Sequence, residues 1–496
     1  MTGISFPATR FPERAVTNQD LAAEAGNYKW KALITTAMGA LMATMDVSIT
    51  NIAFPTLTRV FDKEITTVIW VTVAYVLVST SSMLILGKIS DTVGRKRIYT
   101  FGMLIFTLGM AACSLAQSMG ELIFYRCIQG LGAAMNVSCG AAIVTEAFPL
   151  KETGRGLGFL GISVSLGFII GPVLGGFLLD WLDWRAIFYV RTPVALFTFV
   201  LGLILLKKDR IADHGLRLDL LGALTSSLGI FCLVYGVSRA RDSGFFSPAI
   251  FAWVGCGIVI LSLFTLQERK TPNPLLDLSL FRNRAFLIAS LSLFFTFVSA
   301  PPFILIMPFY LMQGIGMSPS EAGLLLAVNS VATIVCGPVS GALSDRFGPQ
   351  RFAAAGAAAT AFAFVLMMFF NLDTGMAAII LVLILLGVGI GMFQTPNSSM
   401  IMGSVPRDQL GTASALMATV RQVGLSLGMA LAGALYTSRL MQYQSEWVRK
   451  GTEGSEAVRL SIPVAFHDTL LLSIILSAVV VFLSFPLRVE EWRGSS

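Results

Sequence analysis

Residues 87–97 read GKISDTVGRKR, and residues 341–351 read GALSDRFGPQR. The second stretch lies 254 residues (341 minus 87) after the first, and it repeats five residues of it at the same offsets: Gly87/Gly341, Ser90/Ser344, Asp91/Asp345, Gly94/Gly348 and Arg97/Arg351. An internal repeat is the simplest explanation of such a fixed spacing. We therefore predict two structurally similar halves, each with one copy of this charged turn.

The two charged turns interrupt a chain that is otherwise strongly apolar. Of its 496 residues, 55% are hydrophobic and only 13% are charged, and the mean hydropathy is +0.77. Apolar runs of about twenty residues recur along the chain, which is the length of helix that crosses ~30 Å of hydrocarbon. The runs are continuous and lack the alternation of barrel strands. The sequence thus predicts an all-α membrane protein.

About fourteen membrane-spanning helices are expected. We predict six in a first bundle (30–206), two inserted helices (207–270) and six in a second bundle (271–487), with cytosolic tails at 1–29 and 488–496. The loops that face the cytoplasm in this arrangement carry more Lys and Arg than the others. By the positive-inside rule, this bias predicts a multi-pass protein of the cell membrane with both termini in the cytoplasm.

Composition and motifs argue against several other classes. All six cysteines fall inside apolar runs, so neither disulfides nor a metal site is expected. The basic residues are scattered over many loops and form no stripe for nucleic acid. The chain contains no phosphate-binding loop and no HExxH, so we expect neither an ATP-driven pump nor an enzyme, and no cofactor.

Four motifs carry a resemblance to a known family. They are the turn at 87–97, MDVSITNIAFP (45–55), RCIQGLGAA (126–134) and GISVSLGFIIGPVLGG (161–176). Their order and positions resemble the major facilitator superfamily, and within it the fourteen-helix drug:proton antiporters of the EmrB/QacA type. The resemblance implies two six-helix bundles plus two inserted helices, which move a substrate by alternating access.

The resemblance also implies roles for particular residues. A gating loop that latches the two halves is implied for Gly87, Asp91, Gly94, Arg95, Arg97, Asp345, Gly348 and Arg351. An antiporter motif in the fifth helix, typical of exporters, is implied for Gly167, Gly171, Pro172 and Gly175. The three glycines recur every four residues, and such stripes let helices approach closely. The alternative for the charged turns is that they only fix the topology.

Asp46 is the acid that this topology places deep in the membrane in the first half. A charge there costs at least ~2.5 to 3.5 kcal/mol unless it is paired or wetted. Counting along the two helices places Arg126 at the same depth. If the helices are neighbours, as the resemblance implies, the two residues form a proton-coupling site. A fixed ion pair that specifies helix packing is the alternative.

Three other residues received weaker expectations. Gln129 and Arg421 are candidates to line a cavity, and no acid at matching depth is expected for Arg421. Arg191 stands in WRAIFYVRTP (184–193), where relatives usually carry Asn. We expect it to snorkel to the membrane interface.

The function predicted from these observations is proton-coupled export of amphiphilic drugs, either monovalent cations or neutral compounds. One alternative is export of a lipid or lipophilic metabolite on the same scaffold, and a more remote one is a receptor that has lost transport. The expected partners are the substrate, protons and the lipid bilayer. A periplasmic adaptor with an outer-membrane channel is a further candidate, for which the expected outer loop 437–467 offers the contact.

Overall fold

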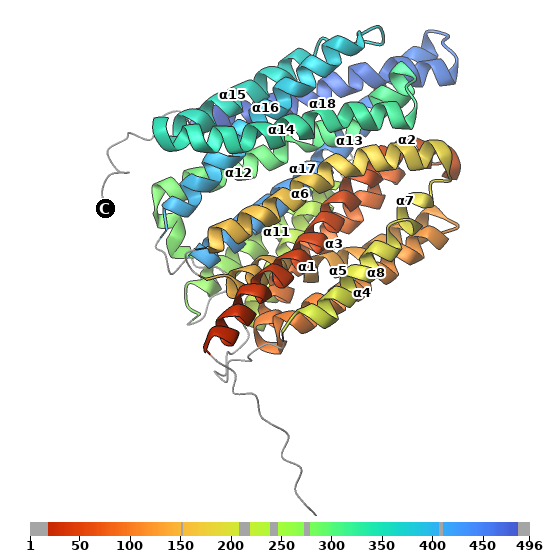
Figure 1. Cartoon of the computed structure of the whole chain (residues 1–496). Coiled ribbons are helices and arrows are strands. Elements are labelled where there is room, and N and C mark those ends of the chain that lie inside the picture. The colour runs from red at the N-terminus through yellow and green to blue at the C-terminus, as the bar shows by residue number, and fades with distance from the viewer. Residues whose placement is uncertain are drawn as a thin grey trace, which may run out of the picture.

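The computed structural model describes residues 18–149, 152–207, 219–238, 247–271, 278–405 and 410–484. In this part of the chain, thirteen helices are long and apolar enough to cross a membrane, and Leu221–Val237 forms a shorter apolar helix. Their total matches the fourteen expected spans. Figure 1 shows the helices in two groups, with the N-terminal helices on one side and the last helices of the chain on the other.

The first group contains the helices up to residue 205. These are α1 (Asn18–Ile52), α2 (Phe54–Phe61), α3 (Ile65–Val93), α4 (Arg95–Leu115), α5 (Met119–Ala147), α6 (Thr153–Trp181), α7 (Ala186–Tyr189) and α8 (Thr192–Leu205). Helix α1 packs against α5, α6 and α8, and α5 also packs against α3 and α4. As a result, the middle of α1 is enclosed by neighbouring helices.

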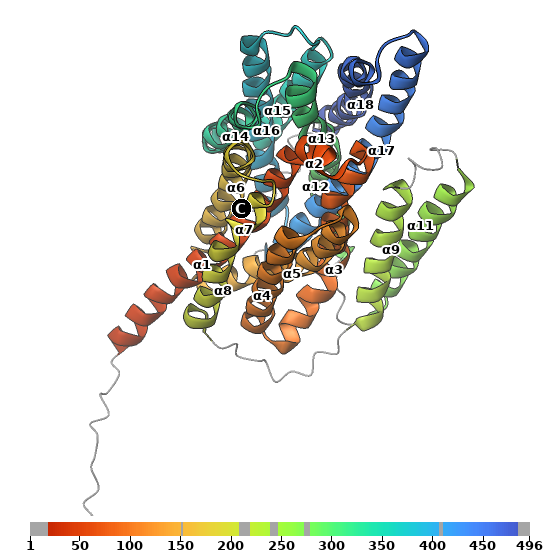
Figure 2. The same ribbon diagram turned by 90° about the vertical axis from the view of Figure 1, so that its right-hand side faces the viewer.

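Two helices, α9 (Leu220–Ser238) and α11 (Pro248–Glu268), come between the two groups in the sequence. Figure 2 shows them as a pair at the edge of the molecule, beside α3 and α17. Tyr235 of α9 packs edge-on against Trp253 of α11, with ring centroids 5.1 Å apart, and against Trp70 of α3. The inserted pair is therefore fixed to the first group through aromatic contacts.

The second group begins with a short 3₁₀ turn, η1 (Leu278–Arg282). The longer elements are α12 (Arg284–Ser299), α13 (Pro301–Phe309), the π-helix η2 (Tyr310–Ile315), α14 (Pro319–Phe347), α15 (Pro349–Met367), α16 (Met376–Gly403), α17 (Leu410–Arg449) and α18 (Gly454–Ser484). Helix α12 packs against α17 and α18, and α16 packs against α14 and α15. The exact division at residues 30, 206, 270 and 487 stays a prediction.

The two groups meet along two seams, α6 with α14 and α3 with α17. Each seam thus joins the second membrane-spanning helix of one group to the fifth membrane-spanning helix of the other. In the α6/α14 seam, a Cβ on Gly176 would come within 2.4 Å of the Pro319 carbonyl oxygen. Further along, the Ser330 hydroxyl donates to the carbonyl of Phe168. In these contacts the residue numbers decrease along α6 as they increase along α14, so the two helices are antiparallel. This arrangement places both charged turns on one side of the molecule, which we call the basic side.

The groups contact each other on the side opposite the basic side. There the Ser320 N–H donates to the Asp180 carboxylate at 2.9 Å, and Phe54 stacks on Phe309 with ring centroids 6.2 Å apart. Toward the basic side, a Cβ on Gly158 or Gly161 of α6 would meet nothing within 4 Å. The α6/α14 seam is therefore closed on one side of the membrane and loose on the other.

One expectation about loops needs correction. The expected outer loop 437–467 is helical: α17 continues to Arg449, and α18 begins at Gly454 after a short turn. The error arose because apolar character ends before these helices do. Helix α1 begins at Asn18, within segment 1–29, and the location of that segment in the cytosol stays a prediction. Residues 1–17 and the tail 488–496 lie outside the described part of the chain.

Candidate functional site

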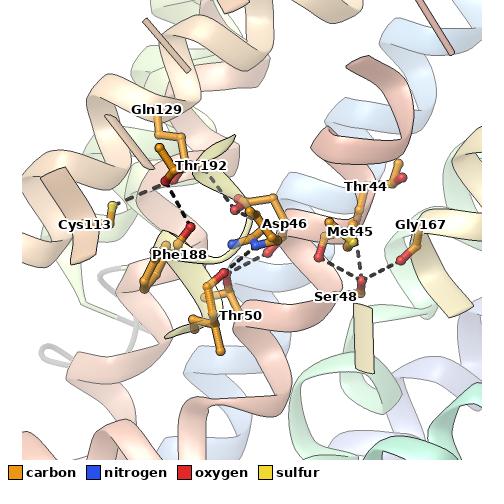
Figure 3. Close-up of polar contacts among 12 residues, drawn as sticks. Thr44, Met45, Asp46, Ser48, Thr50, Cys113, Gln129, Gly167, Phe188 and Thr192 are labelled. Atoms are coloured by element: carbon orange, nitrogen blue, oxygen red, sulfur yellow. Dashed lines mark hydrogen bonds and ion pairs between the residues drawn. The ribbon is translucent and has the colours of Figure 1, made fainter. Parts of the chain in front are cut away.

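Asp46 lies in the membrane-spanning part of α1, six residues before its end at Ile52 (52 minus 46), and is fully buried. Figure 3 shows it on the side of α1 that faces Gln129 and Phe188, whereas Ser48 points toward Gly167. The Asp46 backbone carbonyl accepts a hydrogen bond from the Thr50 hydroxyl at 2.7 Å. Helix α1 thus presents the acid to one set of neighbours and small hydroxyl side chains to another.

Two residues of α5 hold the Asp46 carboxylate. Nη1 of Arg126 contacts Oδ2 of Asp46 in an ion pair, and both side chains are fully buried. The Gln129 amide donates to the other oxygen, Oδ1, at 3.0 Å. Its own oxygen accepts from Arg126 Nη1 at 2.7 Å. The depth match between Asp46 and Arg126 expected from the sequence thus corresponds to a direct contact.

Helix α3 fixes the Arg126 guanidinium from behind. Nε of Arg126 donates to the Val71 carbonyl at 2.9 Å. The guanidinium carbon lies 4.2 Å from the centre of the Tyr75 ring, close enough for a cation–π contact. A Cβ on Gly130 would come within 2.6 Å of the Tyr75 carbonyl, so the backbones of α3 and α5 are very close here. Arg126 is therefore held in place by contacts beyond its ion pair.

Arg191 also binds Asp46, so the prediction that it snorkels to the interface is wrong. It is 1% exposed, and its Nη1 lies 2.9 Å from Asp46 Oδ1. The helix is interrupted here, since α7 ends at Tyr189 and α8 begins at Thr192. Nε of Arg191 donates to the carbonyl of Ile187 one turn earlier. The sequence predicted an uninterrupted helix end here. In the structure the helix is interrupted beside Arg191, and the side chain points toward Asp46.

Asp46, Arg126, Gln129 and Arg191 together form what we call the Asp46 cluster. Their exposed fractions are 0 to 1%, and both carboxylate oxygens have cationic or amide partners. Gln129, a candidate to line a cavity, is fully buried within this cluster, and its role as a cavity residue stays a prediction. Cys113 of α4 donates to the Gln129 oxygen at 3.8 Å and completes the surroundings on that side.

The glycines of the expected antiporter motif lie against α1 on the face away from the Asp46 carboxylate. A Cβ on Gly167 would come within 2.1 Å of the Thr44 hydroxyl, and one on Gly171 within 1.9 Å of the Ser48 hydroxyl. The Ser48 hydroxyl lies 3.1 Å from the Gly167 carbonyl, to which it donates (Figure 3). Gly175 similarly meets Ile49 and Ile52. Helix α6 stays continuous through Pro172.

The two charged turns have the same local structure. Gly94 (φ 112°) and Gly348 (φ 94°) both adopt a positive φ that favours glycine. Each glycine ends the preceding helix in the same way. The N–H of Gly94 donates to the Ser90 carbonyl at 3.0 Å, and the N–H of Gly348 donates to the Ser344 carbonyl at 2.9 Å. The repeat in the sequence therefore corresponds to a repeat in the backbone.

Side chains of the first turn bind within their own group of helices. Arg95 pairs with Asp91 at 3.1 Å and with Glu146 at the end of α5 at 3.2 Å. Gly87 lies beside Ser138 of α5. Arg97 and Arg351 are exposed, and the side chain of Asp345 lies outside the described part. Among the described contacts, none links the first turn to the second group, so the latch between halves stays a prediction.

Two further residues complete the comparison with the sequence. Glu146 was missed, although an acid in the last turn of α5, one residue before its end at Ala147 and on the basic side, is a natural partner for Arg95. Arg421 of α17 is half-buried, and its guanidinium lies 6.0 Å from the Phe297 ring of α12. In the described part of the chain it forms no ion pair, and its role as a cavity residue stays a prediction.

Relatives of this chain are transporters. It is 31% identical over 416 residues to the riboflavin transporter RibZ of Clostridioides difficile, covering 84% of this chain and 90% of the relative. It is 32% identical over 409 residues to the multidrug resistance protein Stp of Mycobacterium tuberculosis (82% and 76%). It is 30% identical over 422 residues to the tetracenomycin C resistance and export protein of Streptomyces glaucescens (83% and 76%).

The fold has a counterpart among solved structures. A bacterial homologue of the human lysosomal transporter Spinster matches with a TM-score of 0.61 at 16% identity, over 92% of this chain and 97% of that one. The model of the Major Facilitator Superfamily matches residues 36–429. The match includes the Asp46 cluster and both charged turns. The chain is therefore a multi-pass membrane transporter, not an enzyme, and it belongs to the Major Facilitator Superfamily.

Proposed function

We propose that this protein is a proton-coupled exporter of amphiphilic, drug-like compounds. The observation that carries the proposal is a fully buried carboxylate, Asp46, held by Arg126, Arg191 and Gln129 inside the helices of a transporter. Buried acids in membrane helices are costly, and in transporters they mark proton relays and substrate paths. Relatives that are named for multidrug resistance and export support the substrate class and direction.

A change in the charge of Asp46 would alter contacts with several helices at once. While ionised, the carboxylate joins α1 to α5 through Arg126 and to the start of α8 through Arg191. A protonated carboxyl would lose both charge-assisted contacts. The opposite face of α1 packs on α6, which forms the seam with the second group. Proton binding would therefore act on the helix that lies next to the moving interface.

Orientation follows from the charged turns. We place the protein in the cell membrane (inner or plasma membrane). Its basic side then faces the cytoplasm and both termini lie there, as the positive-inside rule favours. The α6/α14 seam is then closed toward the outside and loose toward the cytoplasm. This arrangement is suited to taking up substrate from the cytoplasm, and the charged turns would form their latch when the molecule opens outward.

The charge preference expected from the sequence is revised in this proposal. That expectation assumed that the single deep carboxylate, Asp46, is free to pair with a monovalent cation. Both oxygens of Asp46 are engaged by the two arginines and Gln129, so this carboxylate offers no free charge to a cationic substrate. We therefore propose neutral amphiphiles as the better substrates. We also assign the chain to the fourteen-helix drug antiporter branch, on the inserted pair α9 and α11.

The test is ethidium and neutral-dye efflux from cells, compared between the wild type, Asp46→Asn and the matched control Asp62→Asn at equal expression. Asp62 is exposed and has φ 46°, a conformation that Asn tolerates. We expect efflux that an uncoupler abolishes, that Asp46→Asn loses, and that Asp62→Asn keeps. Uncoupler-resistant efflux by the wild type would contradict proton coupling.

Export of a lipophilic metabolite is the second candidate function. It is supported by the similarity to the riboflavin transporter RibZ, whose name gives a metabolite rather than a drug as its substrate. Untargeted comparison of metabolites retained by cells with and without the protein separates the two. If no dye moves but one cellular compound accumulates in the deletion strain, metabolite export replaces drug export.

A tripartite assembly with a periplasmic adaptor and an outer-membrane channel belongs to the same proposal. The hairpin formed by the end of α17 and the start of α18 offers the contact, with Tyr443 and Arg439 both bound to Asp468 at 2.9 and 3.2 Å to hold its two helices together. Site-specific photo-crosslinking from the exposed Val448 in a two-membrane host checks it. Absence of any crosslinked envelope protein would argue that the transporter acts alone.

A further inference from the structure

The Asp46 cluster contains more positive than negative charge. Two guanidinium groups, those of Arg126 and Arg191, meet one carboxylate, and all three groups are at most 1% exposed. The other neighbours with described contacts are Tyr75, Cys113 and Gln129, which are neutral in their ordinary states. Among the described contacts of the cluster, Asp46 is the one acidic partner. The buried cluster therefore has a net charge of +1.

Such a surplus is difficult to remove by any other route. Arginine keeps its proton under all ordinary conditions, so neither guanidinium can become neutral. A buried charge without a counter-charge is strongly destabilising, because the protein interior does not replace the solvation that water gives. The face of the Tyr75 ring offsets part of the Arg126 charge but carries no formal charge of its own. A second negative group would complete the balance.

Spare hydrogen-bond donors are present on both arginines of the cluster. Nη2 of Arg126 and Nη2 of Arg191 are both buried, and neither has an acceptor among the described residues. In each case the Nη1 atom of the same guanidinium contacts Asp46. Since the guanidinium group is rigid and planar, each spare Nη2 donor lies directly beside the Nη1 atom that contacts the Asp46 carboxylate. Buried donors of this kind are normally paired.

We propose that Arg126 and Arg191 bind a small monovalent anion, such as chloride, beside Asp46. The charge surplus calls for one negative charge, and the two spare Nη2 donors supply charge-assisted hydrogen bonds to it. The ligand is small because every member of the cluster is closed to solvent. Arg191 is decisive, since without it Asp46 and Arg126 form a neutral pair. The proposal concerns binding only and holds whether or not the protein exports drugs.

The experiment is equilibrium binding of ³⁶Cl⁻ to the purified full chain in detergent at constant ionic strength, with gluconate as the replacing anion. The wild type, Arg191→Gln and Arg185→Gln are compared. Arg185 is a matched control because it lies six residues earlier, is 38% exposed at its side chain and pairs with Asp183 at the surface. We expect saturable chloride binding to the wild type and to Arg185→Gln, and at least tenfold weaker binding to Arg191→Gln.

Two results would overturn the proposal: a wild type that binds no chloride saturably, and an Arg191→Gln variant that binds it as well as the wild type does. Asp46→Asn gives a second reading if Arg191→Gln does not fold. It removes the negative charge and leaves both arginines, so we expect chloride to bind at least severalfold more tightly. Unchanged or weaker binding by Asp46→Asn would also count against the site. Loss of dye efflux in Asp46→Asn with tighter chloride binding would separate this proposal from proton coupling.

Discussion

Gly323 of α14 lies directly against the backbone carbonyl of Pro172 in α6, where a Cβ at position 323 would come within 2.1 Å of the oxygen. The two halves of the molecule therefore meet backbone to backbone at this point. A side chain of any size would have to push the helices apart. At this point the close approach of the two helices depends on the absence of a side chain at position 323.

Gly323→Val should weaken the closed side of the seam. The added atoms collide with rigid backbone, for which overpacking typically costs about 1–3 kcal/mol. We expect a lower thermal unfolding midpoint and reduced transport. The control is Gly161→Val on α6, where the added Cβ would meet open space. Equal midpoints for the two variants would show that the close approach contributes nothing to stability.

The positive φ angles of the charged turns give a second prediction. Gly94→Ala and Gly348→Ala each force a side chain into a backbone conformation that costs on the order of 1–3 kcal/mol. The turns belong to different helix groups, so the double variant should show the sum of the two losses in a thermal unfolding series. Gly120→Ala, within a helix and next to open space, should be neutral or slightly stabilising. A neutral Gly94→Ala would contradict the assigned turn.

The pairing of Arg95 with Glu146 gives a third prediction, about function rather than stability. Because both side chains are partly exposed, Glu146→Gln should change the free energy of unfolding by at most about 1 kcal/mol. The same change releases Arg95 from α5 and should alter the rate of efflux if the turn is remade during transport. Measuring both quantities on one variant separates the two roles. An unchanged rate would leave the turn with a topological role only.

Lys29 and Glu152 provide a pH-dependent contact on the basic side. Nζ of Lys29 lies 2.5 Å from the Glu152 carboxylate, and this hydrogen bond lowers the pKa of Glu152 below its ordinary value. The contact therefore contributes stability above the ordinary pKa, and the contribution disappears as the pH falls through the lowered value. Glu152→Gln should unfold slightly more easily than the wild type at pH 7, and the difference should shrink as the pH falls below the ordinary pKa of a glutamate carboxyl. A difference that persists in acid would assign it to another cause.

Much of the fold could be predicted because its signals are local. Apolar run length gave the spans, and the repeated Gly and Ser of the two turns gave the two halves. The matching depth of Asp46 and Arg126 followed from counting residues along two helices, which needs only helix geometry and the cost of a charge in the membrane. Their contact was expected only because the family resemblance implies that the two helices are neighbours.

The missed parts of the site depend on breaks and rotations that the sequence does not display. Arg191 reaches Asp46 from the short interruption between α7, which ends at Tyr189, and α8, which begins at Thr192, and no glycine marks this interruption in the sequence. Gln129 is fully buried against Arg126 and Asp46, an orientation that the apolar surroundings of α5 leave undetermined. The hairpin at the end of α17 was missed because its outer part is polar.

The inserted pair gives the molecule unequal flanks in the bilayer. Ile230 and Val234 of α9 pack with Leu77 of α3 and Ala430 of α17, which covers the α3/α17 seam with protein. In the described part of the chain, no further pair of helices covers the α6/α14 seam, and Leu166 of α6 and Leu324 and Val331 of α14 are apolar side chains that remain exposed. A lipophilic molecule dissolved in the membrane would thus meet helices α9 and α11 on one flank and the uncovered α6/α14 seam on the other. Lateral entry from the lipid would then take place at the α6/α14 seam.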